Sequence, residues 1–453
     1  CEGEDRGTWW NSRGDLMFST LKNAFKIKEI RVKLLFTFLM LVVIRFGSQL
    51  PIPGVNRDYF SSWFEAQTGG AFSFFDAFTG GSFSRMSVFA LNITPYITSS
   101  IIMQLLTIAI PKLEEMQKDG EDGRKKIASI TRYVTVALAL IESAAMAIGF
   151  GNQGLLQKYG PLEVITVIAV LTAGSAFLMW IGERITEKGV GNGISIVLII
   201  NIISRLPDDF AKLYEQFCKG KSIPLAVVAA VIIIAIILAM TVFVVVLNSA
   251  VRKIPVQYAK KIQGNKMVGG QMTFLPLKVN TAGVIPIIFA SSLMQFPIVI
   301  STLVGYSGNG IWRQILNALN QDSWCNPDQL VYSIGLVVYV LLTVFFAYFY
   351  TSLTFNPLEI ANNMKKQGGF IPGIRPGKPT SDYLNKVLNA IIFIGAIGLV
   401  VVAVVPFFFN GVFKASVSFG GTSLIIIVSV VLETIKQIES QMLVRNYKGF
   451  LND

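Results

Sequence analysis

The sequence is divided into apolar blocks of roughly twenty residues, each about as long as a helix needs to cross a hydrocarbon core near 30 Å thick. Ten such blocks lie at 33–50, 87–109, 130–150, 161–181, 194–206, 224–248, 281–303, 330–352, 387–409 and 419–437. They do not show the alternation of outer-membrane strands. Only 15% of the residues are charged, against about a quarter in soluble proteins. The sequence therefore predicts an all-α polytopic membrane protein with ten transmembrane helices.

Lys and Arg are distributed unequally between the connections. If the N-terminus is cytoplasmic, the cytoplasmic connections hold 27 Lys and Arg residues and the opposite ones hold 9. Loops rich in positive charge remain in the cytoplasm during insertion. We therefore predict that both termini are cytoplasmic, and topology explains most of the net charge of +12 without nucleic-acid binding.

The segment 71–84 is apolar but too short to span, and it lies directly before the second block. In lipid its ends would expose unpaired backbone groups, so it must lie within protein or a water-filled cavity. We interpret it as a re-entrant half-helix that fills a cavity from the outside. The alternative is an interfacial helix that lies flat on the membrane.

The fifth and tenth blocks both begin at a glycine cluster followed by a hydroxyl residue, GVGNGIS from Gly189 and FGGTSL from Phe419. Because five crossings make up each half of the chain, a repeat of one half in the other would be inverted, with its functional path between the halves. Two unrelated glycine-rich helix starts would give the same pattern. The inverted repeat is therefore a hypothesis.

Several kinds of chemistry are excluded. The chain contains no histidine, which removes Ser-His nucleophilic sites and most zinc sites. No block contains an aspartate, so an aspartyl protease within the membrane is excluded. GVGNG also lacks the Lys-Ser/Thr of a phosphate-binding loop. We expect no catalytic residue, metal or cofactor, and predict that the chain is not an enzyme.

Glu142 lies midway through the third block. A charged group within the membrane is costly unless it faces water or a partner, so Glu142 has either a function or a hydrogen bond to nearby hydroxyls that fixes helix packing. A coupled transporter would place several such groups together. Because Glu142 is a lone carboxylate at this depth, we consider a secondary transporter a weaker hypothesis than a passive channel.

The connections 249–278 and 353–386 are long and rich in proline, glycine and basic residues. Proline and glycine set turns, so we predict structured loops that protrude from the membrane. Arg375 lies between two Pro-Gly pairs, and we therefore expect it to contact a partner.

Two other features are less informative. Cys218 and Cys325 fall in predicted outside loops, which is a weak indication of a disulfide. The stretch from Cys1 to Asp15 is polar and contains tryptophan, unlike the rest of the chain. The natural start is therefore expected at Met17, with the preceding residues an added or unusual extension.

Several long motifs occur in order: GSQLPIPGVN at 47–56, FTGGSFSRMSVFALNITPYITSSIIMQLL at 78–106, EKGVGNGIS, LPLKVNTAGVIPIIFASS at 275–292, PGIRPG and FGGTSL. Together they resemble the SecY family of bacterial protein-conducting channels, from about Met17 to the C-terminus. The resemblance implies two inverted five-helix halves around an hourglass pore. The implied parts are an N-terminal extension (1–16), an N-terminal half (17–206) with a plug at 71–84, an external hinge loop (207–223), a C-terminal half (224–437) and a cytoplasmic tail (438–453).

The resemblance also implies site residues, in four groups. The pore ring is Ile93, Ile97, Ile194, Leu198, Ile288 and Ile426; the plug includes Phe72, Phe74, Phe75, Gly80 and Gly81; the lateral gate includes Thr98, Glu142, Ser292 and Thr422; partners dock at Arg252, Lys253 and Arg375. Leu198 stands where isoleucine is expected, and Glu142 where a neutral glutamine is expected. A narrow aliphatic ring dewets, and so blocks water and ions without binding any particular passing side chain.

The function implied by the resemblance is passage of unfolded secretory polypeptides across the bacterial cytoplasmic membrane, with hydrophobic segments released sideways into lipid through the lateral gate. The implied partners are a SecE-like and a SecG-like subunit, the motor ATPase SecA, the ribosome through its RNA, signal peptides, unfolded preproteins and membrane lipids. The channel itself would need no nucleotide.

Overall fold

The computed structural model describes most of the chain. The described residues are 25, 27–66, 76, 79–152, 154, 156, 159–217, 219, 223–258, 261–263, 266–268, 272–304, 310–325, 331–413 and 421–449.

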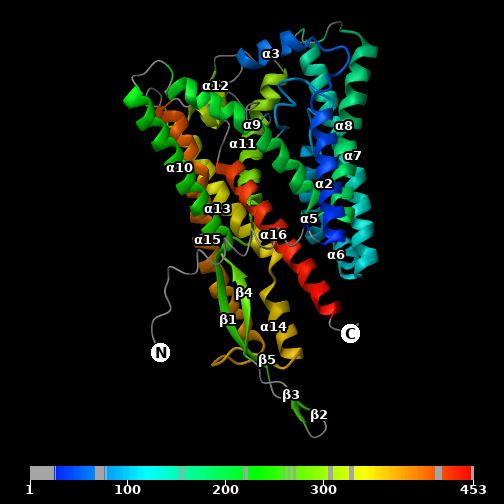
Figure 1. Cartoon of the computed structure of the whole chain (residues 1–453), viewed down its shortest axis with the longest axis vertical. Helices are drawn as coiled ribbons and strands as arrows, with labels where there is room; N and C mark the ends of the chain where they lie inside the picture. The colour runs from blue at the N-terminus through cyan, green and yellow to red at the C-terminus, as the bar shows by residue number, and fades with distance from the viewer. Residues whose placement is uncertain are drawn as a thin grey trace. The chain divides into compact units, whose positions relative to one another are not determined.

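Helices dominate these residues (Figure 1). The helices are α2 (Lys28–Gly47), α3 (Arg57–Ala66), α5 (Thr94–Ala109), α6 (Pro111–Lys118), α7 (Glu121–Asn152), α8 (Pro161–Lys188), α9 (Gly193–Phe217), α10 (Ile223–Ser249), α11 (Ile285–Val304), α12 (Ile311–Leu319), the 3-10 helix η1 (Gln321–Ser323), α13 (Ile334–Thr354), α14 (Pro357–Lys366), α15 (Lys378–Phe413) and α16 (Gly421–Gly449). The strands are β1 (Val251–Tyr258), β2 (Lys261–Gln263), β3 (Lys266–Val268), β4 (Met272–Lys278) and β5 (Gly369–Phe370).

Each predicted membrane block falls on a helix: α2, α5, α7, α8, α9, α10, α11, α13, α15 and α16, in chain order. Within the described part of the chain, five helical segments are long and apolar enough to cross a membrane: Glu121–Asn152, Pro161–Lys188, Ala230–Ser249, Val331–Lys366 and Lys378–Phe409. The number is six if α5 and α6, which meet at a bend of 102°, count as one broken span. The predicted helical membrane fold is confirmed.

The second span begins later than predicted. Its helix α5 starts at Thr94, whereas the apolar block starts at residue 87. The residues between are in turns, and Asn92 has a φ of 52°, in the left-handed region that a helix cannot contain. Pro95 then lies in the first turn of α5, where its missing N–H has no cost.

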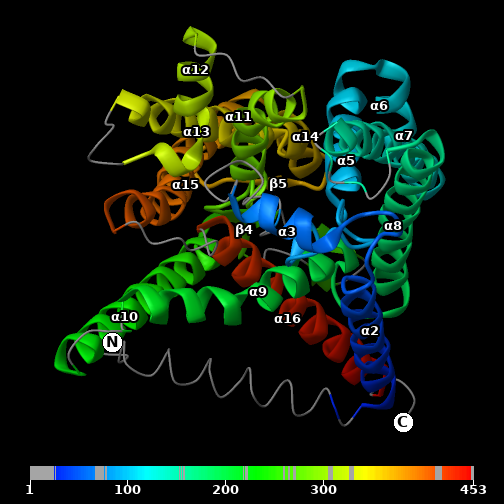
Figure 2. The same ribbon diagram turned by 90° about the horizontal axis from the view of Figure 1, so that it is seen from above.

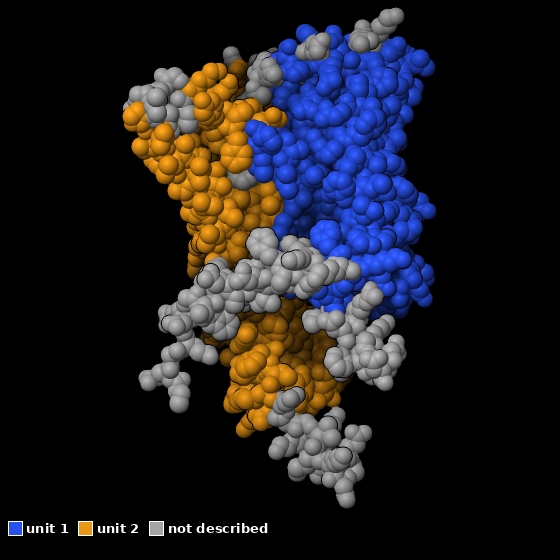
Figure 3. Space-filling model, viewed as in Figure 1, with its two compact units in different colours: residues 1–207, 303–305, 429–453 blue, residues 208–302, 306–428 orange. Residues whose placement is uncertain are grey.

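The chain divides into two compact units (Figure 3). Unit 1 consists of residues 1–207, 303–305 and 429–453, and unit 2 of residues 208–302 and 306–428. The residues of α16 from Ser429 onward group with unit 1. There Ile438 packs in a small core with Ile30 and Val190, which explains the grouping.

Unit 1 contains helices α5, α7 and α8, which lie side by side (Figure 2). The Ser99 and Thr135 hydroxyls, 2.5 Å apart, join α5 to α7. The Ser143 and Thr172 hydroxyls, 2.9 Å apart, join α7 to α8. Small hydroxyl residues at such contacts let helices approach closely and hydrogen-bond across the interface in lipid.

Unit 2 contains a small sheet of strand order β4-β1-β5. Strands β1 and β4 are antiparallel, with Val251 opposite Lys278 and Gln257 opposite Met272. Strand β5 adds to the other side of β1, with Gln257 opposite Phe370. The two segments predicted as protruding loops, 249–278 and 353–386, therefore pair through their backbones.

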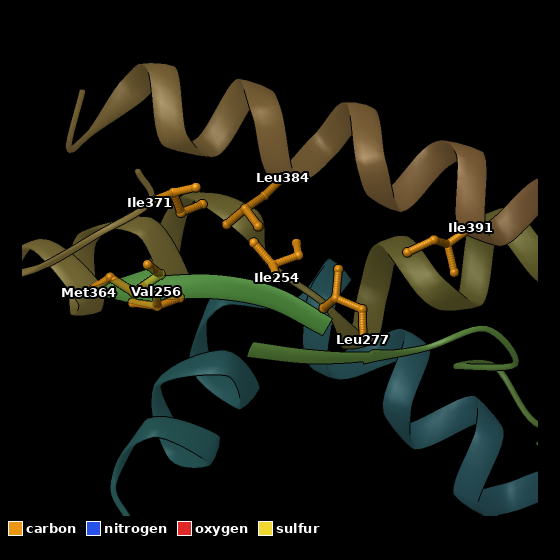
Figure 4. Packing of buried hydrophobic residues seen from close by; sticks show 7 residues of the cluster. All are labelled: Ile254, Val256, Leu277, Met364, Ile371, Leu384 and Ile391. Carbon is orange, nitrogen blue, oxygen red and sulfur yellow. The ribbon is translucent and has the colours of Figure 1, made fainter. Parts of the chain in front are cut away.

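These two segments also share a hydrophobic core (Figure 4). Helix α14, which lies within the second segment, and helix α15 both contribute to it. Its buried members are Ile254, Val256, Leu277, Met364, Ile371, Leu384 and Ile391. Ile254 and Val256 alternate along β1 with exposed Lys253 and Pro255, as expected for a strand with one face covered. The sheet is thus a folded body at the end of unit 2.

The connection between α11 and α13 is anchored by Trp324. This side chain is fully buried, lies against Tyr339 and Phe407 with ring centroids 5.4 and 5.1 Å away, and donates its indole N–H to the carbonyl oxygen of Ala318 at 2.8 Å. The C-terminal end of α12 is therefore fixed to α13 and α15.

Candidate channel site

The six candidate ring residues are distributed over both units. Ile93, Ile97, Ile194 and Leu198 belong to unit 1, and Ile288 and Ile426 to unit 2. Ile93, Leu198 and Ile426 are buried, with exposed fractions of 0%, 9% and 2%, and the other three are half-buried. Ile194 packs close to α8, since a Cβ on Gly182 would lie 2.5 Å from its Cδ1. Membership of a common ring remains a prediction.

The candidate plug is described from its second half onward. Phe72, Phe74 and Phe75 lie outside the described residues, whereas Gly80 and Gly81 lie within them and are buried. The turns after Thr79 are organised by Asp76, whose Oδ1 accepts the backbone N–H of Ser84 at 2.8 Å. The backbone oxygen of Asp76 accepts the N–H of Gly81 at 3.2 Å.

A polar network surrounds the middle of α9. The Asn201 amide donates to the side-chain oxygen of Asn92 at 3.0 Å, and Arg45 donates to Asn201 Oδ1 at 3.5 Å. Arg205, one turn further along α9, forms an ion pair with Asp76. These groups bring together the end of α2, the turn before α5, and the candidate plug.

Sequence reasoning missed most of this network. Asn201 and Arg205 are four residues apart near the end of an apolar block, and so lie on one face of the helix. Polar residues within spans usually face protein or water. This four-residue spacing is the signal in the sequence that could have indicated the network. The charge of Arg205 hides the signal, because an arginine at the end of an apolar block is usually assigned to the connection that follows.

The candidate gate residues have different environments. Thr98 is half-buried and donates to the Thr94 carbonyl of its own helix at 3.1 Å. Glu142 is half-buried on α7, and Ser292 is exposed on α11. The side chain of Thr422 lies outside the described residues. The hydroxyl on α5 that contacts α7 belongs to Ser99, the residue after Thr98.

Loss of the Ser99 hydroxyl should loosen the contact between α5 and α7. We expect Ser99→Ala to lower the free energy of unfolding by about 1 kcal/mol, the typical value of a hydrogen bond between membrane helices. Thermal unfolding of purified protein in detergent measures this change. The matched control is Ser129→Ala, because Ser129 is half-buried on α7 and its hydroxyl donates within that helix, to the Lys125 carbonyl at 3.1 Å. Equal effects of the two substitutions would contradict the assignment.

The candidate docking residues belong to the folded body of unit 2. Arg252 and Lys253 are exposed at the start of β1, and Arg375 is exposed in the turn after β5. That turn is held by Ile371, which is 3% exposed, and by the Thr380 hydroxyl, which donates to the carbonyl oxygen of Arg375 at 2.8 Å. The side chain of Arg375 therefore projects from a fixed backbone.

Among the described residues, no group of His, Cys, Asp and Glu could hold a metal ion. Cys325 carries a free thiol, and its partial burial raises the pKa of that thiol. Cys218 lies outside the described residues.

The fold and these features define a polytopic helical membrane protein with a polar network beside the described part of the segment 71–84. The SecY family model matches residues 87–435. The chain is 44% identical over 442 residues to the protein translocase subunit SecY of Halalkalibacterium halodurans. The match covers 96% of this chain and 100% of that protein. The chain belongs to the SecY family.

Solved structures agree on the fold. One is a SecY protein whose plug domain stabilises the closed state of the translocation channel and maintains a membrane seal; it matches with a TM-score of 0.61 and 18% identity, over 93% of this chain and 97% of that one. Another is Sec61 in a canine ribosome-channel complex from the endoplasmic reticulum, with a TM-score of 0.57 and 16% identity over the same shares.

Proposed function

We propose that this chain is the pore subunit of a bacterial Sec translocon, which passes unfolded secretory polypeptides across the cytoplasmic membrane. The observation that carries the proposal is the 44% identity, over nearly the whole chain, to a protein translocase subunit SecY. The test is transport of an unfolded secretory chain into vesicles that contain the purified protein and its partners.

The pore is closed at its waist by the six aliphatic residues of the ring, Ile93, Ile97, Ile194, Leu198, Ile288 and Ile426. Aliphatic side chains suit a substrate of arbitrary sequence, because they offer no bond that one passing side chain would make and another would not. The absence of histidine from the sequence fits a conduit that performs no acid-base chemistry of its own. The chain is accordingly a channel rather than an enzyme.

The segment 71–84 is the plug that seals the outer side of this pore. In the SecY structure with a similar fold, the plug domain stabilises the closed state, which supports this role. The burial of Gly80 and Gly81 fits a segment that rests within protein rather than flat on a membrane surface.

The lateral gate lies between the second and third spans on one side and the seventh and eighth on the other, with Thr98, Glu142, Ser292 and Thr422 along it. Hydroxyl contacts across such a gate are weak, about 1 kcal/mol each, so a hydrophobic signal segment can replace them. Glu142 adds an ionisable group where the family is expected to have a neutral one.

Arg252, Lys253 and Arg375 bind the partners that drive transport, a SecA-type motor or the ribosome. The ribosome complex of the similar Sec61 structure supports the second partner, which would be bound through its RNA by a salt-sensitive electrostatic contact. A SecE-like and a SecG-like subunit would lie beside the chain. The excess of Lys and Arg in the connections on one side of the membrane supports a topology with both termini cytoplasmic.

A further inference from the structure

One face of α9 contacts the candidate plug through a charged pair. Arg205 on this face forms an ion pair with Asp76, and their side chains are 15% and 1% exposed. A buried pair of this kind is costly to form, but it is much more costly to remove only one partner, because the other charge remains buried without compensation. The position of the plug segment is therefore coupled to the charge on Arg205.

The same face of α9 contacts the plug segment a second time, at Gly80. The Gly80 backbone has a φ of +67°, and a Cβ there would lie 2.7 Å from the carbonyl oxygen of Asn201 and 2.8 Å from the hydroxyl of Ser204. The Ser204 hydroxyl also donates to the Gly80 carbonyl at 3.5 Å. Only a residue without a side chain allows this approach.

Asn201, Ser204 and Arg205 have the spacing that places them on one helix face, and we call them the latch face. Asn201 also holds Asn92, in the turn before α5, at 3.0 Å. The latch face thus contacts both ends of the segment that runs from Asp76 to the start of the second span.

We propose that the latch face holds the plug in its closed position, with Asp76–Arg205 as the charged contact and Gly80 as the close backbone contact. The inference rests on the proposed function, in which 71–84 is the plug. When the plug leaves this position for the water-filled pore, both charges regain hydration. The ion pair can therefore break and form again as the plug moves. If only one of the two charges is present, it is buried without a partner in the closed position, and this favours the displaced plug.

The test measures ion leak through the resting channel, reconstituted with its partner subunits in planar bilayers. Arg205→Gln should raise the leak roughly tenfold or more, because it leaves Asp76 buried without its partner. The double variant Asp76→Asn with Arg205→Gln should leak less than Arg205→Gln alone, because no unpaired charge then remains. Asp208→Asn, an exposed carboxylate three residues further on, is the control and should leak like the wild type. An unchanged leak in Arg205→Gln, or a double variant that leaks as much as Arg205→Gln or more, would overturn the proposal.

A pair of glycine variants keeps the test decisive if charge variants fold poorly. Gly80 and Gly81 both have positive φ, +67° and +79°, so alanine strains the backbone equally at the two positions. A Cβ on Gly81 would have only an ordinary contact, 3.6 Å from the Arg85 guanidinium. We expect Gly80→Ala to raise the leak and Gly81→Ala to leave it near the wild-type level. Equal leaks in the two variants would refute the close contact.

Transport by the same preparations separates this proposal from the proposed function. If the wild type transports a secretory chain and the latch variants do not leak, the latch is wrong and the channel assignment stands. If the wild type does not transport, the channel assignment fails, whatever the latch variants do.

Discussion

Replacing Arg375 by Glu should abolish motor-driven transport while the protein still folds. Arg375 is exposed, and the contact that holds its turn is made by its backbone oxygen with Thr380, so the substitution should change the free energy of unfolding by no more than about 0.5 kcal/mol. Reversal of the charge places like charges together at the docking surface, which costs several kcal/mol of binding and corresponds to a loss of roughly thirtyfold or more in affinity. Transport rate at a fixed, limiting motor concentration measures the effect.

The control is Lys386→Glu, which makes the same charge change on an exposed position of α15. It should transport at close to the wild-type rate. Normal transport by Arg375→Glu would remove this residue from the docking site. Equal losses in both variants would indicate a general effect of net charge rather than a specific contact.

Introducing asparagine into the ring should open the resting channel to ions. Ile93 and Ile426 are 0% and 2% exposed, and an amide at either position would hold water in a constriction that is otherwise dewetted. We expect Ile93→Asn and Ile426→Asn to raise resting conductance by roughly tenfold, since a barrier lower by only about 1.4 kcal/mol produces that factor. Single-channel recording in planar bilayers measures it.

The matched control for the ring is Ile181→Asn. Ile181 is also 0% exposed but lies on α8, outside the ring. This substitution should lower stability as any buried polar group does, without raising conductance. If Ile181→Asn leaks as much as Ile93→Asn, the leak reports damaged packing and the ring assignment loses its support.

The helices could be predicted from the sequence because each needs only local information. Apolar blocks of span length locate α7, α8, α10, α13 and α15 directly, and the prediction fails mainly at helix ends. The start of α5 is an example, because the left-handed Asn92 precedes Pro95 in a stretch that remains apolar throughout. Hydropathy does not detect such a change of backbone conformation.

Contacts between distant segments could not be predicted in this way. Strand β5 pairs with β1 although more than a hundred residues separate them, and the core that includes Ile254 and Ile371 forms only after that pairing. The Asp76–Arg205 pair likewise depends on how the plug segment folds back onto α9. The family resemblance supplied the ring, gate and docking residues, but it did not indicate this pair.

The most direct test of the central claim is transport of an unfolded secretory polypeptide into sealed vesicles. The vesicles should contain the purified chain with its partner subunits, and a SecA-type motor with ATP should be added outside. Protease protection of the polypeptide measures transport. The channel assignment predicts protection that requires the chain, the motor and ATP together. If the polypeptide remains fully digestible while each component is folded and the motor hydrolyses ATP, the assignment is contradicted.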